Sequence, residues 1–300
     1  VYFVDDNFIA NKRAVREMLP HLIEWQKRNG YPLLLSCEAT LNIAKRPEIL
    51  ELMREAAFTT VFCGIETPDP EALKSISKDH NMMVPIIGAI ETMNSFGMEA
   101  VSGIIVGLDT DTPDTGRYLL DFVEQSQIPL LTMNLLQALP RTPLWDRLKR
   151  EQRLIEDDDS RESNVAFRMP YDQVLAMWRE CMRVAYLPEK LFARYEHQIR
   201  VAYSKRKRLP NSPQRASWRN IRRALVMLSR ILWIVGVKGD YRRVFWRYAW
   251  ARLRRGQIEY LIAVPLLAHH LILFAREASA GRRVASHYSF KPSEELVPAE

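Results

Sequence analysis

Short apolar runs alternate with longer segments of helical periodicity through the first half of the chain. The runs cover residues 1–4, 32–38, 59–66, 99–107 and 130–137. Each is four to nine residues long and rich in β-branched or other large apolar side chains, which predicts a strand. Because both faces of these runs are apolar, the strands are expected to be covered on both sides.

The segments between the predicted strands repeat apolar positions at helical spacing. They cover residues 11–29, 47–57, 84–96 and 112–127, with a shorter segment at 70–76 and a closing one at 142–149. Strand and helix therefore alternate five times, which predicts a parallel sheet with right-handed crossover connections.

Every predicted strand ends at a polar side chain. These residues are Asp5 and Asp6, Glu38, Glu66, Asp109 and Gln137. Capping of the following helix is the better explanation for any single one of them. Because the carboxyl ends of parallel strands share one rim, where such folds bind ligands, the complete set favours a binding site.

The fourth strand contains Gly103 and Gly107, which would let a ligand or a neighbouring helix approach the backbone closely. The chain has no G-x-G-x-x-G and no G-x-x-x-x-G-K-[ST] sequence, so neither a dinucleotide site nor a P-loop is predicted. Cys37, Cys63 and Cys181 are too scattered for a disulfide framework or a metal site of their own. A reducing, cytoplasmic location is expected.

The two halves of the chain differ in charge. Residues 1–150 carry 15 basic and 20 acidic side chains, and the remainder carries 28 basic and 16 acidic ones. We therefore expect an α/β domain over 1–150, a charged linker without periodicity over 151–169, and an all-α, basic domain over 170–300. Its predicted helices cover 170–187, 191–203, 218–237, 241–255 and 258–275.

Residues 205–255 contain sixteen Lys or Arg and a single acid, Asp240, with aromatic residues interleaved. One interpretation is a helical domain whose arginines face water or pair with the acidic half. A second is contact of residues 205–275 with an anionic membrane surface, and a third is binding to nucleic acid. The membrane ranks above nucleic acid because the neighbouring helices are so apolar. The helix over 258–275 barely reaches spanning length and contains Pro265, so it is expected to be buried or interfacial.

Four motifs occur in an order typical of one enzyme family. They are Val1-Tyr2-Phe3-Val4-Asp5-Asp6-Asn7-Phe8, Gly64-Ile65-Glu66-Thr67-Pro68, Gly103-Ile104-Ile105-Val106-Gly107-Leu108-Asp109 and Gln137-Ala138-Leu139-Pro140-x-Thr142-Pro143-Leu144. On these motifs the chain resembles a radical S-adenosylmethionine enzyme of the cobalamin-binding branch. Members of that branch carry a helical C-terminal domain of uncharacterised role, and they include hopanoid methylases.

The resemblance implies that the five strands are strands 2–6 of a partial (β/α) barrel. In that family the first strand is followed by C-x-x-x-C-x-x-C, which binds a [4Fe–4S] cluster, and a cobalamin domain precedes the barrel. Neither is found in this chain, so the resemblance implies a fragment that is inactive alone and holds no metal ligand.

The resemblance also implies a set of S-adenosylmethionine contacts. Asp5 and Asp6 would meet the methionyl ammonium, and Glu66 the ribose or carboxylate. Gly103, Ile105, Gly107 and Gln137 would lie beside the adenine, and Glu38 and Asp109 complete the set at the rim.

The activity implied is methylation of an unactivated carbon. A 5′-deoxyadenosyl radical would abstract hydrogen, methylcobalamin would deliver the methyl group, and a reductant protein would supply electrons. The basic, apolar second half makes a lipid or isoprenoid substrate such as a hopanoid the expected one, with the protein peripheral at the inner face of the membrane. RNA is the alternative substrate, and a non-catalytic binding or scaffold remnant of the barrel is the alternative outside enzymes.

Overall fold

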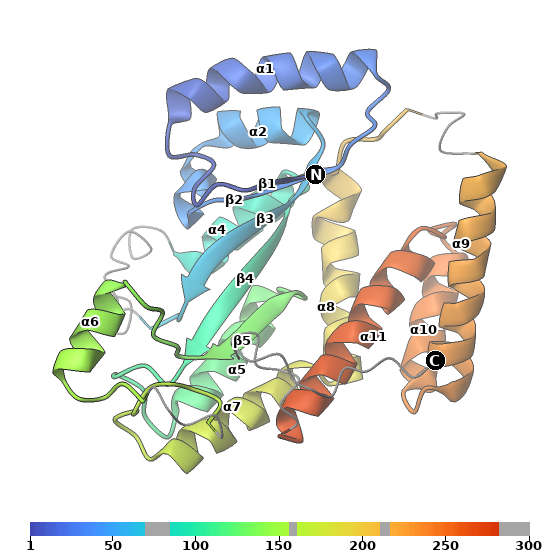
Figure 1. The fold of residues 1–300 in the computed structure, drawn as a ribbon. Coiled ribbons are helices and arrows are strands. Elements are labelled where there is room, and N and C mark those ends of the chain that lie inside the picture. Colours follow the sequence, from blue (N-terminus) through green and yellow to red (C-terminus); the bar gives the residue numbers. More distant parts are fainter. Residues whose placement is uncertain (70–84, 156–160, 211–216, 282–300) are drawn as a thin grey trace, which may run out of the picture.

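The computed structural model describes residues 1–69, 85–155, 161–210 and 217–281 (Figure 1). Its centre is a sheet in the order β1-β2-β3-β4-β5 in which every neighbouring pair is parallel. The strands are β1 (Tyr2–Phe3), β2 (Leu35–Glu38), β3 (Phe58–Glu66), β4 (Glu99–Val106) and β5 (Leu131–Leu135). The predicted α/β class with a parallel sheet is confirmed.

Four strands are shorter than predicted: β1, β2 and β5 by two or three residues each, and β4 by one. Residues 32–34 precede β2 and are not part of it, and Pro32 has no N–H to donate to a neighbouring strand. The first strand pairs only through Tyr2 and Phe3, with Ser36 and Cys37 of β2.

Helices connect the strands. They are α1 (Lys12–Arg28), α2 (Pro47–Glu55), α4 (Ile86–Ser95), α5 (Thr115–Ser126) and α6 (Pro143–Arg150), with a 3₁₀ turn over Leu41–Lys45. The Asn11 side chain caps α1 by accepting a hydrogen bond from the N–H of Ala14 at 3.1 Å. The Thr142 hydroxyl caps α6 in the same way, by accepting from the N–H of Trp145 at 3.2 Å. These helices match the predicted segments within a few residues, whereas the predicted helix at 70–76 lies outside the described residues.

The second half is helical, as predicted. It consists of α7 (Tyr171–Ala185), α8 (Pro188–Val201), a 3₁₀ turn (Tyr203–Lys205), α9 (Trp218–Ile231), a π-helix (Leu232–Lys238), α10 (Arg242–Leu253) and α11 (Tyr260–Ser279). Figure 1 shows α7 and α8 beside the sheet and α9 on the far side of this helical domain. The indole N–H of Trp178 in α7 donates to the carbonyl of Met133 in β5 at 2.9 Å and ties the halves together.

The prediction of one uninterrupted helix over 218–237 is wrong in detail, because the α-helix ends at Ile231 and continues as a π-helix. Gly236 explains how this wider turn packs on α10. A Cβ there would lie 2.9 Å from the ring of Phe245, and the Gly236 carbonyl accepts from the indole N–H of Trp246 at 2.9 Å. The predicted helix over 191–203 also begins earlier, at Pro188, whose fixed φ suits a first turn.

Part of the basic stretch docks on the first half. Arg206 donates to the carbonyls of Gly97 at 3.2 Å and Thr59 at 3.1 Å, and Lys207 pairs with Glu55. These two cations are therefore engaged inside the molecule, as the first of the three interpretations expected.

Among the described residues one helix, α11, is long and apolar enough to cross a membrane, judged by length and composition. This is weak evidence for a span, because 44% of the apolar window is buried and the helix packs against α7, α8 and α9. Buried helices of water-soluble domains have the same composition. Its burial agrees with the predicted buried or interfacial helix.

Candidate cofactor site

One face of the sheet is covered by helices and the other is partly open. In β5, the side chains of Leu131, Met133 and Leu135 point to the covered face and are buried. Those of Thr132 and Asn134 point to the other face and are exposed. Strand pairing aligns further residues with these two on the same side. We call this side the open face; it comprises Glu38, Phe62, Gly64, Gly103, Ile105, Thr132 and Asn134.

The middle of the open face is flat because two neighbouring strands place glycine there. Gly64 of β3 is paired with Gly103 of β4, and Gly103 is paired with Thr132 of β5. A Cβ on Gly103 would lie 3.2 Å from Oγ1 of Thr132 and 3.9 Å from the ring of Phe62. The missing side chains leave a shallow surface on which a planar group can lie against backbone.

Polar groups border this flat patch on both sides. Asn134 and Thr132 are exposed on β5, and the half-buried carboxylates of Glu38 and Glu66 end β2 and β3. Amide, hydroxyl and carboxylate groups beside a flat apolar patch can bind a ligand that carries hydroxyls and a planar ring.

Glu66 has an unusual backbone conformation. Its φ is +64°, in the left-handed region, and the pairing register of β3 with β4 shifts between Gly64 and Glu66. A non-glycine residue in this region costs on the order of 1 kcal/mol or more and is enriched at functional sites. Between the pairs Gly64–Gly103 and Glu66–Ile104, β3 contains one residue more than β4.

The loop after β1 is fixed next to the end of β2. The Glu38 carboxylate accepts from the Tyr2 hydroxyl at 2.7 Å, and its carbonyl accepts from the N–H of Phe8 at 2.8 Å. Asp5 accepts from the N–H of Asn7 at 2.9 Å, so this carboxylate stabilises its own turn. Asp5 and Asp6 are exposed and lie in the loop that contacts Glu38.

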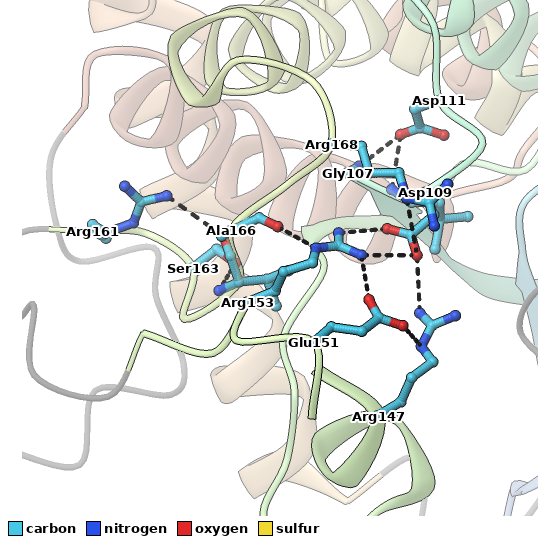
Figure 2. Close-up of polar contacts among 12 residues, drawn as sticks. Gly107, Asp109, Asp111, Arg147, Glu151, Arg153, Arg161, Ser163, Ala166 and Arg168 are labelled. Atoms are coloured by element: carbon cyan, nitrogen blue, oxygen red, sulfur yellow. Dashed lines mark hydrogen bonds and ion pairs between the residues drawn. The ribbon is translucent and has the colours of Figure 1, made fainter. Parts of the chain in front are cut away.

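Asp109 is surrounded by arginines, as Figure 2 shows. Its oxygens lie 2.6 and 3.1 Å from the guanidinium of Arg153, 3.1 Å from Arg147 and 3.8 Å from Nε of Arg168. The Asp109 side chain is only 8% exposed. Burial raises the pKa of this carboxyl, but the hydrogen bonds and charges of the arginines outweigh burial and leave the pKa below its ordinary value.

The neighbouring carboxylate, Asp111, holds the turn after β4. Its Oδ2 accepts from the N–H groups of Gly107 at 2.7 Å and Leu108 at 3.1 Å, and burial raises its pKa. Gly107 has φ +99°, and a Cβ there would lie 2.6 Å from the ring of Phe167. Glycine at 107 is therefore required by the turn and by close packing of Phe167.

Gln137 is also engaged by the segment that follows α6. Its Nε2 donates to the carbonyl of Glu162 at 2.6 Å, and its Oε1 accepts from the N–H of Asn164 at 3.2 Å. Asn164 in turn donates to the carbonyl of Ala138 and accepts from its N–H. The described residues between 151 and 169 are thus packed against the rim of the sheet; the boundary of the linker stays a prediction.

The structure divides the predicted site residues into three groups. Glu38, Gly103 and Ile105 lie on the open face, and Glu66 lies at the end of β3, where it pairs with Ile104. Asp5 and Asp6 lie in the adjoining loop. Gly107, Asp109 and Gln137 contact the segment from Arg147 to Arg168. The contacts of the last group are internal to the chain, so packing alone explains these three residues.

Sequence reasoning missed Thr132 and Asn134 on the open face. The run Leu131-Thr132-Met133-Asn134-Leu135 alternates apolar and polar residues, which is the signal of a strand with one exposed face. The expectation that both faces of every strand are apolar is therefore wrong for β5.

No group of three or more His, Cys, Asp or Glu that could hold a metal occurs within the described ranges. Cys37, Cys63 and Cys181 are buried, and burial raises the pKa of Cys63 and of Cys181 to about 12. Thiols of this kind are poor metal ligands, because the thiolate is the form that binds.

The structure is that of a parallel α/β protein with a helical second half, and the open face of its sheet is the candidate ligand site. Residues 142–283 match a protein family described as Domain of unknown function (DUF4070). The chain is 63% identical over 300 residues to the hopanoid C-2 methylase of Rhodopseudomonas palustris strain TIE-1, covering all of this chain and 56% of that protein.

Two further relatives are methyltransferases by name. An uncharacterized methyltransferase of Synechocystis sp. is 33% identical over 279 residues, which is 90% of this chain and 50% of that protein. The bacteriochlorophyllide d C-12(1)-methyltransferase of Chlorobaculum tepidum is 23% identical over 147 residues, covering 49% of this chain and 31% of that protein. The chain spans about half the length of the first two relatives. The matches confirm the predicted resemblance: the chain is a relative of hopanoid C-2 methylase.

Proposed function

We propose that the chain is the C-terminal part of a cobalamin-dependent radical S-adenosylmethionine methyltransferase that acts on an unactivated carbon of an isoprenoid lipid such as a hopanoid. The observation that carries this proposal is the 63% identity to hopanoid C-2 methylase over all 300 residues of the chain. The order of the four strand-end motifs supports the radical class, and the names of the relatives support methyl transfer.

The open face fits S-adenosylmethionine. The glycine patch at Gly64 and Gly103 offers a flat surface beside Ile105 for the adenine, and Thr132 and Asn134 offer hydrogen-bonding groups at its edge. Glu66 and Glu38 provide acceptors for ribose hydroxyls, and the loop at Asp5 and Asp6 provides carboxylates for the methionyl ammonium.

An iron–sulfur cluster does not fit the cysteines described here. Cys37 and Cys63 lie on the covered side of the sheet, and Cys181 is buried in α7, so the three cannot converge on one cluster. We assign no residue of this chain to the cluster or to cobalamin. When bound, the cluster would supply the electron that cleaves S-adenosylmethionine and cobalamin would carry the methyl group, whereas the chain described here would position S-adenosylmethionine.

The test is anaerobic reconstitution of the complete gene product with iron, sulfide and cobalamin, followed by incubation with a reductant, S-adenosylmethionine and a hopanoid. The proposal predicts release of 5′-deoxyadenosine and a hopanoid product heavier by one methylene unit, both detected by mass spectrometry. A protein that binds no cluster, or that releases 5′-deoxyadenosine only with an RNA substrate, contradicts the proposal.

A matched pair of variants assigns activity to the open face. Asn134→Leu removes a polar group from that face, whereas Asp114→Asn alters an exposed carboxylate at the start of α5. Asn134→Leu is expected to lower turnover at subsaturating S-adenosylmethionine, and Asp114→Asn is expected to leave it unchanged. Equal activity in the two variants would remove Asn134 from the site.

A further inference from the structure

Helix α9 leaves its apolar residues in solvent. Trp218, Ile221 and Leu225 recur at helical spacing, and Trp218 is 74% and Leu225 57% exposed. In this helix only Ile231, at its end, is fully buried. An amphipathic helix of a globular protein usually turns its apolar stripe inward, so an outward stripe needs a partner.

The exposed apolar surface continues past the end of α9. Trp233, Ile234 and Val237 in the π-helix are exposed, while Val235 and Gly236 anchor this turn against the rest of the domain. We call Trp218, Ile221, Leu225, Trp233, Ile234 and Val237 the α9 surface. Figure 1 places α9 at the side of the helical domain remote from the sheet.

The charge of this region is entirely positive. Residues 217–238 contain Arg219, Arg222, Arg223, Arg230 and Lys238 and no acidic residue. All five side chains belong to exposed residues, and within the described ranges none of them forms an ion pair. In this respect they differ from Arg206 and Lys207, which dock on the first half.

The positive charge and the exposed apolar side chains together indicate what kind of partner this surface fits. Uncompensated arginines attract an anionic surface, and tryptophan near each end of the exposed stripe suits the boundary between head groups and acyl chains. Nucleic acid would use the arginines but not Ile221, Leu225 or Val237. A second copy would bring two like-charged surfaces together, which is unfavourable.

We propose that the α9 surface docks the protein on an anionic lipid bilayer, with the apolar stripe inserted among the head groups. This proposal does not depend on the proposed methyl transfer, because docking needs neither the open face nor a cofactor. A protein that modifies a lipid would gain access to its substrate by such docking.

The test is flotation of the full chain with vesicles of phosphatidylcholine alone and of phosphatidylcholine mixed with phosphatidylglycerol. Binding to the mixed vesicles is expected, together with weak binding to phosphatidylcholine and a loss of binding as salt rises. The variants Leu225→Ser and Arg222→Glu are each expected to weaken binding to mixed vesicles about tenfold, because each removes a contact made only at the membrane.

Matched controls separate docking from a general effect of the substitutions. Leu34→Ser and Arg13→Glu make the same changes on the first half, where Leu34 is 53% exposed and the Arg13 side chain 90% exposed. The controls are expected to bind as the unaltered chain does, with all four variants keeping its circular dichroism spectrum.

Four results would overturn the proposal: no binding to mixed vesicles, equal binding to both vesicle types, equal losses in α9 and control variants, or self-association that Leu225→Ser abolishes. RNA binding that Arg222→Glu weakens and Leu225→Ser does not would assign the surface to nucleic acid instead.

Discussion

Asp109 accepts two hydrogen bonds from the guanidinium of Arg153, at 2.6 and 3.1 Å, across 44 residues of sequence. The pair joins the end of β4 to the segment after α6. Because the same carboxylate also lies 3.1 Å from Arg147, one buried acid compensates the charge of more than one arginine. This geometry makes Asp109 an anchor for the rim of the sheet.

Replacing Asp109 should therefore destabilise the fold. Asp109→Asn removes the two-pronged ionic partner of Arg153, whose side chain is 15% exposed and which keeps only its ion pair with Glu151, and we expect a loss of about 3 kcal/mol in the free energy of unfolding. Urea unfolding followed by circular dichroism measures this difference. In the control Asp114→Asn, the lost ion pair is 3.7 Å long and exposed, so the expected cost is below about 0.5 kcal/mol. Similar losses in both variants would show that Asp109 is no anchor.

The same variant has an expected pH dependence. The folded-state pKa of Asp109 is lowered, so its stabilising contribution is present above the unfolded-state pKa and is lost as pH falls through the folded-state value. The difference in unfolding free energy between the unaltered chain and Asp109→Asn should be constant near neutral pH and should shrink below about pH 4. A stability difference that grows as pH falls would contradict the lowered pKa of Asp109.

The contribution of Glu99 to the unfolding free energy should depend on pH in the opposite direction. It is buried at the start of β4 and accepts from the Tyr203 hydroxyl at 2.6 Å, and burial raises its pKa despite Tyr203 and Arg206. A carboxyl with a raised pKa lowers stability as pH rises above its unfolded value. The variant Glu99→Gln should therefore gain stability relative to the unaltered chain as pH rises above about 4.5. Urea unfolding midpoints of both proteins, measured at several pH values above about 4.5, test this prediction. A stability advantage of Glu99→Gln that shrinks as pH rises would refute it.

Gly107 tests the packing of the segment after α6 against β4. Gly107→Ala should cost about 2 kcal/mol or more, since a side chain at φ +99° is strained and its Cβ would meet the Phe167 ring at 2.6 Å. The control is Gly256→Ala. Gly256 has φ +67°, and no atom lies within 4 Å of a Cβ placed there, so only the backbone strain of about 1 kcal/mol is expected. Thermal unfolding of both variants measures the difference between their stability losses. Equal costs would mean that Phe167 moves aside freely.

The architecture could be predicted because its signals are local. Apolar runs and helical periodicity are properties of neighbouring residues, and parallel order follows from their alternation. That reasoning placed the strand ends on one rim and assigned no side of the sheet to Glu38, Gly103 or Ile105, which strand pairing aligns on the open face.

The roles of Asp109 and Gln137 could not be predicted in this way. Their partners, Arg153 and Asn164, lie in a charged segment without periodicity, so nothing local shows where these side chains go. The left-handed backbone of Glu66 was equally hidden, because a register shift depends on the neighbouring strand and not on the residue itself. The π-helix after Ile231 likewise depends on how Gly236 packs against Phe245 and Trp246.

The most direct test of the central claim is the affinity of the complete protein for S-adenosylmethionine when the open face is filled. Gly103→Val introduces a side chain whose Cβ lies 3.2 Å from Thr132 Oγ1, whereas Gly88→Ala adds a methyl group to α4 with nothing within 4 Å. Isothermal titration with both variants should give a dissociation constant raised at least about tenfold for Gly103→Val and an unchanged one for Gly88→Ala. Unchanged affinity in a folded Gly103→Val variant would contradict the placement of the cofactor on this face.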